Sequence, residues 1–162
     1  MKHLYWGNVE QDWAGFSSDI HFSHPFFNKQ EIEIFLNDEY DEDYEEIEEP
    51  PTEVLLNEFA DTYKNFIEHI ENRLADLQQK AFERYKELYA HYYENPEKSG
   101  EPALNINTAD KHNPYIKDIN YLRISKNKTI RLTIRYGLDE EHGLEFKFVD
   151  GQIADVGGIA DT

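Results

Sequence analysis

The feature that most constrains this fold is a helical pattern too long for a compact chain of this size. From Glu53 to Tyr93, apolar residues recur every three or four positions with no Gly or Pro between them, which predicts one continuous helical face. A single helix of that length would span ~60 Å at ~1.5 Å per residue. A compact domain of this length measures only ~40 Å across. We therefore expect two helices, with a break or sharp kink between His69 and Asn72. The predicted apolar face contains Leu55, Phe59, Tyr63, Phe66, Ile70, Leu74, Leu77, Ala81, Tyr85, Leu88 and Tyr92.

Strands are expected before this helical region. Glu31–Leu36 alternates apolar and acidic residues, which is typical of a half-buried strand. Ser18–Phe22 is its expected neighbour, and a first strand is predicted within Leu4–Val9, followed by a turn at Asp12–Gly15. These strands form the N-terminal part of the predicted sheet.

A second group of strands follows the helical region. Strands are predicted at 120–125, 129–136, 144–148 and 152–156. The short turns between them, and the Asp150-Gly151 turn above all, predict an antiparallel four-stranded meander. Alternate residues of these strands are apolar, so one face of the meander should be covered by helices.

The order of the elements predicts an α+β fold. We expect an antiparallel sheet, made of the N-terminal strands and the C-terminal four-stranded meander, with two helices packed on one face. The polar stretch 97–114 is expected to be a long loop. No repeat or shift in composition divides the chain, so residues 1–162 are expected to form a single domain.

Acidic residues dominate the composition and exclude several functions. The chain has 34 Asp and Glu against 16 Lys and Arg, which gives a formal net charge of -18. Such a surface repels phosphate backbones and anionic lipids, so neither nucleic acid nor a membrane is an expected partner. No apolar run of ~18 residues and no signal peptide is predicted, and a cytoplasmic protein is expected. The absence of cysteine excludes a disulfide scaffold and a thiolate metal site.

Half of the net charge lies in one segment. Residues 37–49 contain nine acids and no base. We name Asp38–Glu49 the acidic segment and expect a solvated loop, followed by a helix with Thr52 as N-cap. The segment is either a solubility feature or mobile connector, or a docking segment for a basic partner with Tyr40 and Tyr44 as anchors. Calcium binding is disfavoured, because the run lacks the glycine and spaced oxygen ligands of an EF-hand loop.

One small cluster contains ligands that could bind a metal. Asp19, His21 and His24 are weak metal candidates, since histidine and carboxylate are the ligands that a chain without cysteine can offer. The alternative interpretation is a surface loop, because positions three apart on a strand point to opposite faces.

A second cluster, Asp139 to Gly143, places carboxylates beside a histidine. Asp139, Glu141 and His142 could act as general acid and base, form a solvated turn, or contact a partner. The chain contains no nucleophile elbow, phosphate-binding loop or HExxH motif. No catalytic residue is therefore assigned, no cofactor is expected, and the residues favour a protein that is not an enzyme.

Basic residues alternate with core residues on the last strands. Arg123, Arg131, Arg135 and Lys147 should form a stripe on the outer face of the sheet. The stripe could pair with Glu145, with the acidic segment or with another subunit. A pocket for an anionic ligand is the alternative.

The C-terminal residues resemble the ending of a group of small bacterial proteins of unknown function. The resemblance rests on Ile130-x-Leu132-x-Ile134, on the Asp139-Glu140-Glu141-His142-Gly143-Leu144 turn, and on Asp150-Gly151 before the last strand. Some proteins of that group look like immunity proteins of bacterial toxin systems, which are small, acidic, non-catalytic and cytosolic. The resemblance implies the same role here.

These observations favour a non-catalytic, acidic protein-binding domain, an immunity protein for a basic bacterial toxin being one form of it. The alternatives are a small metal-dependent hydrolase and a housekeeping domain whose acidity provides solubility. The expected partner is a protein with a basic surface, and a homo-oligomer is also compatible with the sequence. The predicted partner-binding residues are Asp38, Glu39, Tyr40, Asp41, Glu42, Asp43, Tyr44, Glu45, Glu46, Asp139, Glu141 and His142.

Overall fold

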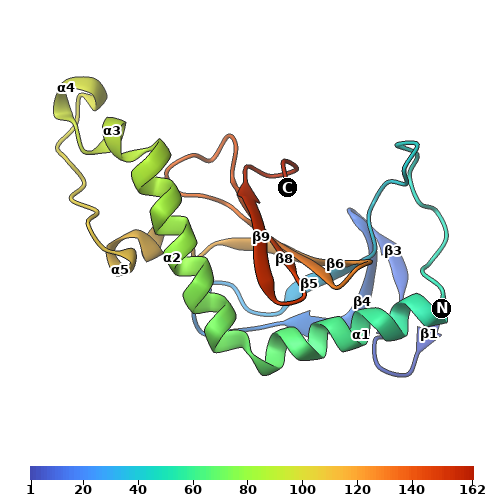
Figure 1. Ribbon diagram of the computed structural model, residues 1–162. Helices are drawn as coiled ribbons and strands as arrows, with labels where there is room; N and C mark the ends of the chain where they lie inside the picture. The colour runs from blue at the N-terminus through green and yellow to red at the C-terminus, as the bar shows by residue number, and fades with distance from the viewer.

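A seven-stranded sheet and two long helices form the body of the molecule (Figure 1). The computed structural model describes residues 1–162. The sheet has the strand order β3-β4-β5-β6-β7-β8-β9. Its strands are β3 (Glu10–Asp12), β4 (Gly15–Phe22), β5 (Ile32–Leu36), β6 (Ile119–Ser125), β7 (Thr129–Ile134), β8 (Leu144–Val149) and β9 (Gln152–Gly157). The prediction of an α+β fold is confirmed.

The C-terminal meander is present as predicted. Strands β6 to β9 pair antiparallel with their neighbours, and Leu132 faces both Leu122 and Phe146 in register. The inward side chains of β6, β7 and β8 are almost completely buried, which explains their strict alternation with polar residues. The turn between β8 and β9 uses Asp150 and Gly151, both with positive φ, as its sequence predicts.

The N-terminal strands differ in part from the prediction. Strands β4 and β5 pair antiparallel, as expected. A strand, β2 (Gly7–Asn8), does lie within the predicted Leu4–Val9, but it pairs with β1 (Lys2–His3) in a separate two-stranded hairpin rather than in the main sheet. The ring nitrogen Nδ1 of His3 accepts the backbone N–H groups of Tyr5 and Trp6, and this turns the chain there. Trp6 is thereby buried, and its indole N–H donates to the carbonyl of Leu56 at 2.9 Å.

The expectation of a purely antiparallel sheet needs a correction. Strands β5 and β6 lie side by side in parallel, with Ile34 opposite Leu122. The sheet is therefore mixed, although its other pairs are antiparallel. A parallel pair needs a crossover connection. Here the acidic segment and all five helices lie within that connection.

The break in the helical region is confirmed. Helix α1 (Glu53–Glu68) ends before His69, whose φ of -111° and ψ of 24° are not helical, and α2 (Ile70–Leu88) begins after it. The two helices meet at a sharp angle (Figure 1). Thr52 caps α1 as predicted, with its Oγ1 accepting the N–H of Leu55 at 3.3 Å. The predicted apolar face is buried only as far as Tyr85, since Leu88 and Tyr92 are exposed.

Three short helices add to the two that were predicted. They are α3 (Ala90–Tyr93), α4 (Pro96–Ser99) and α5 (Ala109–His112). The prediction of one long loop over 97–114 is therefore wrong. Asn95 and Thr108 cap α4 and α5 with their side chains, and Pro96 occupies the first turn of α4.

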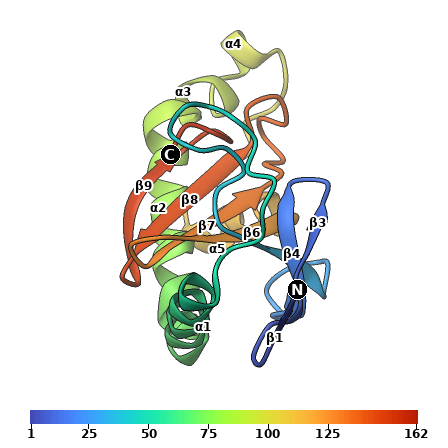
Figure 2. The same cartoon turned by 90° about the vertical axis from the view of Figure 1, so that its right-hand side faces the viewer.

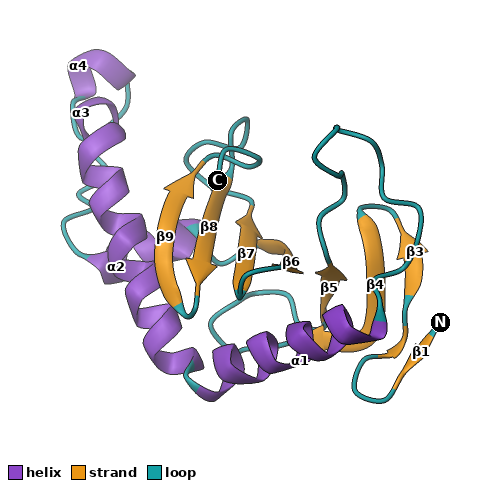
Figure 3. Ribbon diagram, turned by 45° about the vertical axis from the view of Figure 1, so that its right-hand side comes forward, coloured by secondary structure: helices purple, strands orange, loops and turns teal.

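The two long helices cover one side of the sheet (Figure 3). On that side, Phe66 of α1 packs edge-to-face on Phe148 of β8 at 5.3 Å. The same hydrophobic cluster contains residues from the N-terminal hairpin, both helices and the whole meander. None of the helices combines the length and the apolar character that crossing a membrane requires.

Candidate docking surface

The acidic segment forms an ordered projection between β5 and α1 (Figure 2). The prediction of a loop is confirmed. Its tip is a tight turn in which Tyr40 bridges Glu46, and the Asp41 carboxylate accepts the N–H groups of Asp43 and Glu45 at 2.9 and 3.0 Å. Tyr44 lies in this turn with a positive φ of 61° and is 89% exposed. The hydrogen bonds of this turn therefore hold the Tyr44 side chain in an exposed position.

The charges of the acidic segment are largely unpaired. Of its nine carboxylates, only that of Asp38 lies within 4.0 Å of a basic group, the guanidinium of Arg131. The acids at the tip, from Asp41 to Glu46, are exposed. Water and dissolved ions therefore screen the repulsion between these carboxylates, and their negative electrostatic potential extends into the surrounding solution.

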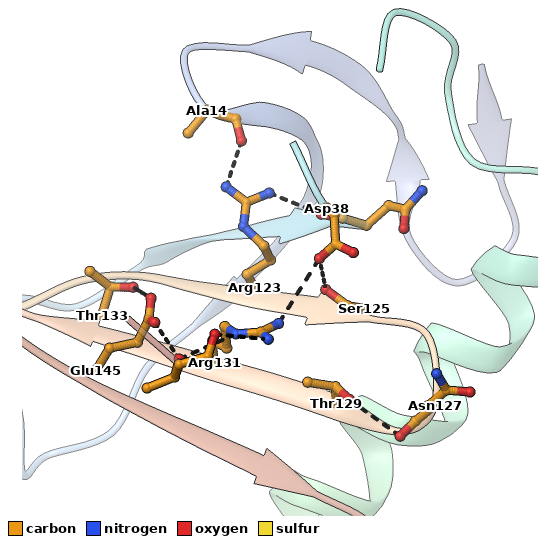
Figure 4. Close-up of polar contacts among 11 residues, drawn as sticks. Ala14, Asp38, Arg123, Ser125, Asn127, Thr129, Arg131, Thr133 and Glu145 are labelled. Carbon is orange, nitrogen blue, oxygen red and sulfur yellow. Dashed lines mark hydrogen bonds and ion pairs between the residues drawn. The ribbon is translucent and has the colours of Figure 1, made fainter. Parts of the chain in front are cut away.

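The base of the acidic segment is fixed to the outer face of the sheet (Figure 4). Ser125 of β6 donates its hydroxyl to Asp38 at 2.8 Å. Arg123, also on β6, donates to the carbonyl of Asn37 at 2.9 Å and to that of Ala14 at 2.7 Å. One guanidinium therefore connects the start of the acidic segment with the turn between β3 and β4.

The outer basic stripe does not act as a unit. Only 8% of Arg123 is exposed, and its partners are carbonyls rather than carboxylates. Arg131 contacts Asp38 and Thr162, as expected in part, whereas Arg135 binds Glu140 at 2.6 Å. No acidic group lies within 4.0 Å of Lys147. Three of the four stripe residues, all except Lys147, are thus engaged in local contacts within the fold.

Glu145 has a different set of contacts from those predicted. It is buried, and it accepts hydrogen bonds from the hydroxyls of Thr133 and Thr162. The C-terminal Thr162 thereby lies across the outer face of β7 and β8, where Arg131 also contacts it.

The second cluster of predicted partner residues lies apart from the first. Figure 1 shows the β7–β8 loop, which contains Asp139, Glu141 and His142, well away from the acidic segment. Asp139 and His142 do come together, with 3.0 Å between Nδ1 and the carboxylate. Glu141 is exposed. The structure therefore separates the twelve predicted residues into two surfaces.

The Asp139 carboxyl is held by the fold rather than offered to a partner. The hydroxyl of Tyr89, the C-cap residue of α2, donates to it at 2.7 Å. Partial burial opposes ionisation of Asp139, but the hydrogen bonds from Tyr89 and His142 outweigh it and lower the pKa of this carboxyl. The hydrogen bond with Asp139 raises the pKa of His142 above its usual value. The Tyr89–Asp139 hydrogen bond therefore fastens the β7–β8 loop to the end of α2.

The weak metal candidates do not converge. Asp19 accepts the backbone N–H of Asn8 at 2.9 Å, and His21 lies against the carbonyl of Asp19 at 3.2 Å. His24 instead contacts Glu71 of α2 at 2.8 Å. No three His, Asp or Glu side chains in the structure are grouped so that they could hold a metal ion.

A groove of 560 Å³ lies between α1 and the β6–β7 and β8–β9 turns, and none of the predicted site residues lines it. Its rim carries both signs of charge, with Glu58 and Asp61 on α1 facing Lys126 and Lys128. Lys128 is also near Asp150, at 3.8 Å. This mixed rim does not select either a cationic or an anionic ligand.

Sequence reasoning missed an exposed tryptophan. Trp13 lies in the turn between β3 and β4 and is 63% exposed. Its ring packs edge-to-face on Phe35 and Tyr121, with ring centroids 5.3 and 5.5 Å away. The available signal was its position in the turn predicted at Asp12–Gly15, because connecting segments usually lie at the surface.

A buried histidine was also missed. His112 of α5 is fully buried, and its Nε2 lies 2.6 Å from the hydroxyl of Tyr136. Burial lowers the pKa of His112 to about 4 and raises that of Tyr136. The two side chains are enclosed by aromatic rings, including Tyr85 and Tyr89. The pair therefore holds α5 on the fold.

Comparison with known proteins identifies a family without assigning an activity. A protein-family model matches residues 5–161, and the family is described as Domain of unknown function (DUF6985). No curated protein and no solved structure matches the chain. The match covers nearly the whole chain and confirms the expectation of a family of unknown function.

Proposed function

The chain belongs to the DUF6985 family, and because that family has no assigned function, we propose a role from the chain's own surface. The protein is a non-catalytic binding domain, and the acidic segment is its docking element for a partner protein with a basic surface. The observation that carries this proposal is the exposed, largely unpaired charge of the acidic segment on an ordered turn.

The arrangement supports two steps of association. Unpaired carboxylates attract a cationic partner over about a Debye length, which raises the rate of encounter. The exposed ring of Tyr44 then adds short-range contact, because aromatic residues often supply much of the binding energy at interfaces. The ordered turn reduces the entropy lost when the partner binds.

We infer in addition that the partner is a basic bacterial toxin, which the protein neutralises as an immunity protein. Two features support this finer proposal: the net charge of -18 and the resemblance of the C-terminal residues to proteins of that kind. An immunity protein of this type acts by occupying the toxin's surface and needs no catalytic group of its own.

The test compares two variants that lose the same charge at different places. The loop variant carries Glu42→Gln, Asp43→Asn, Glu45→Gln and Glu48→Gln, which leaves the turn-forming Asp41 and the anchored Asp38 intact. The matched control carries Glu68→Gln, Asp76→Asn, Glu87→Gln and Glu101→Gln, all exposed.

Each protein is used to capture partners at low ionic strength from a lysate of the source organism, with quantification by mass spectrometry. We expect wild type and the control to retain the same basic protein, and the loop variant to lose it. Retention should also fall steeply with salt. Equal retention by both variants would show that the acidic segment is not the docking element.

A further inference from the structure

An aromatic patch lies on the outer face of the sheet, beside the base of the acidic segment. We define the patch as Trp13, Phe35 and Tyr121, whose rings pack edge-to-face at 5.3 to 5.5 Å. Phe35 is buried beneath the other two, and Trp13 is the most exposed member. The helices cover the opposite face of the sheet, so they do not cover this patch.

The exposed ring of Trp13 is held in place. Its indole N–H donates to the carboxylate of Glu33 at 3.1 Å, and two rings pack against it. A fixed aromatic side chain loses little conformational freedom on binding. Trp13 therefore has the properties of an interface anchor.

Two carboxyl groups adjoin this ring without a cation. Asp12 accepts the backbone N–H of Trp13 at 2.8 Å, and Glu33 accepts the indole N–H of the same residue at 3.1 Å. The hydrogen bond from the backbone N–H of Trp13 lowers the pKa of Asp12, which favours the charged form of this carboxyl. Neither carboxyl takes part in any ion pair of the structure. A cation placed between them would relieve the repulsion of two like charges.

The one cation of this region is already fully engaged. The guanidinium of Arg123 lies over Phe35 and Tyr121 at 5.2 and 5.5 Å, and it donates to two backbone carbonyls. It is buried and leaves the outer ring of Trp13 free. The charge that the patch presents to solvent is therefore negative.

The aromatic patch and the acidic segment are parts of one surface. Arg123 bridges the carbonyls of Ala14, next to Trp13, and Asn37, next to the acidic segment. Figure 4 shows this bridge from β6 to both chain segments. A weaker contact, of 3.5 Å, joins Gln11 of β3 to Glu46.

We propose that the aromatic patch receives a lysine or arginine side chain of the basic partner, with the cation over the Trp13 ring and beside Asp12 and Glu33. This inference rests on the proposed function and names the contact that follows electrostatic encounter. The face of an indole ring attracts cations more strongly than other aromatic rings do. An apolar or anionic partner would have to desolvate the two carboxylates with no compensating charge.

The test uses an oligo-arginine peptide, with an oligo-glutamine peptide of the same length as its control. Affinity is measured by isothermal titration calorimetry for wild type, Trp13→Ala, Glu33→Gln and Tyr92→Ala. Tyr92 is a matched control, since it is an exposed aromatic residue on α3, far from the patch. Glu33→Gln removes a charge but keeps an oxygen that accepts the indole N–H.

We expect Trp13→Ala to weaken binding of the arginine peptide about tenfold. Glu33→Gln should weaken it as well, and Tyr92→Ala should leave it unchanged. Binding should also change the tryptophan emission of wild type but not that of Trp13→Phe, in which only the buried Trp6 remains. The loop variant should bind more weakly yet keep the emission change.

Three results would overturn this inference. If Trp13→Ala and Tyr92→Ala both bind like wild type while the loop variant binds weakly, the patch is not the contact and the proposed function stands. If wild type does not bind the peptide at low salt, both proposals fail. If sedimentation shows a dimer that Trp13→Ala dissociates, the patch is instead an interface between two copies of this chain.

Discussion

At the residue scale, the buried pair of His112 and Tyr136 gives the fold a pH dependence. The pKa of folded His112 is about 4, against a usual value of 6.5, because burial disfavours the charged ring. Between these values the unfolded chain binds a proton that the folded chain does not. We expect the free energy of unfolding to fall as the pH drops from 6.5 towards 4, by on the order of 3 kcal/mol in total.

Urea denaturation near pH 7 and near pH 4 checks this prediction against His112→Gln, whose amide can reach Tyr136. Wild type should lose more of its free energy of unfolding between pH 7 and pH 4 than His112→Gln does, because the variant has no imidazole to protonate. His142→Gln is an informative control, because a raised pKa gives the opposite sign: its stabilisation is lost as the pH rises. A difference that does not change with pH would contradict the burial of a neutral His112.

Single residues were also the least predictable part of the candidate surface. Tyr44 was recognised because it stands among charges that cannot be buried. Alternation assigned Arg123 to the outer face but says nothing about which segments cover that face, and Trp13 was not singled out at all. Their roles depend on contacts between segments that are distant in sequence.

At the scale of single elements, the N-cap of α1 stabilises the point where the chain passes from the acidic segment into the helix. Thr52 accepts the Leu55 N–H and closes the crossover from the acidic segment into the helix. We expect Thr52→Ala to lower the free energy of unfolding by about 1 kcal/mol. Thr62→Ala, within the same helix, serves as the control and should be neutral or slightly stabilising, because alanine is the better helix former.

Elements with a regular pattern were predictable, and short ones were not. The strands of the meander and the break at His69 followed from alternation and from chain length. Helices α4 and α5 have only four residues each, too few to show a period, so their signal was confined to the caps Asn95 and Thr108. The pairing of β5 with β6 could not be predicted, because alternation does not specify a neighbour.

At the scale of the whole molecule, the two parts of the sheet should unfold together. They meet at the parallel pair of β5 and β6, and one hydrophobic cluster extends across both sides of that pair. Leu122 is fully buried there, opposite Ile34. We expect Leu122→Ala to lower the free energy of unfolding by about 3 kcal/mol. Every unfolding signal should move by the same amount, so that the midpoints stay coincident as in wild type.

The measurement combines tryptophan fluorescence with far-ultraviolet circular dichroism. Trp6 reports on the N-terminal hairpin, and circular dichroism reports mainly on α1 and α2. Coincident transitions are expected for wild type and variant. Two separate midpoints would mean that the N-terminal strands unfold independently of the helices, which pack on the meander through Phe66 and Phe148.

The way the acidic segment is attached also affects how the family can diversify. The sheet holds it through the backbone carbonyl of Asn37 and the side chain of Asp38, and α1 begins at Thr52. The fold thus places few demands on the side chains at the exposed tip. Under the proposed function, substitutions there would alter which partner is recognised while the scaffold keeps its stability, and specificity and foldability could evolve separately.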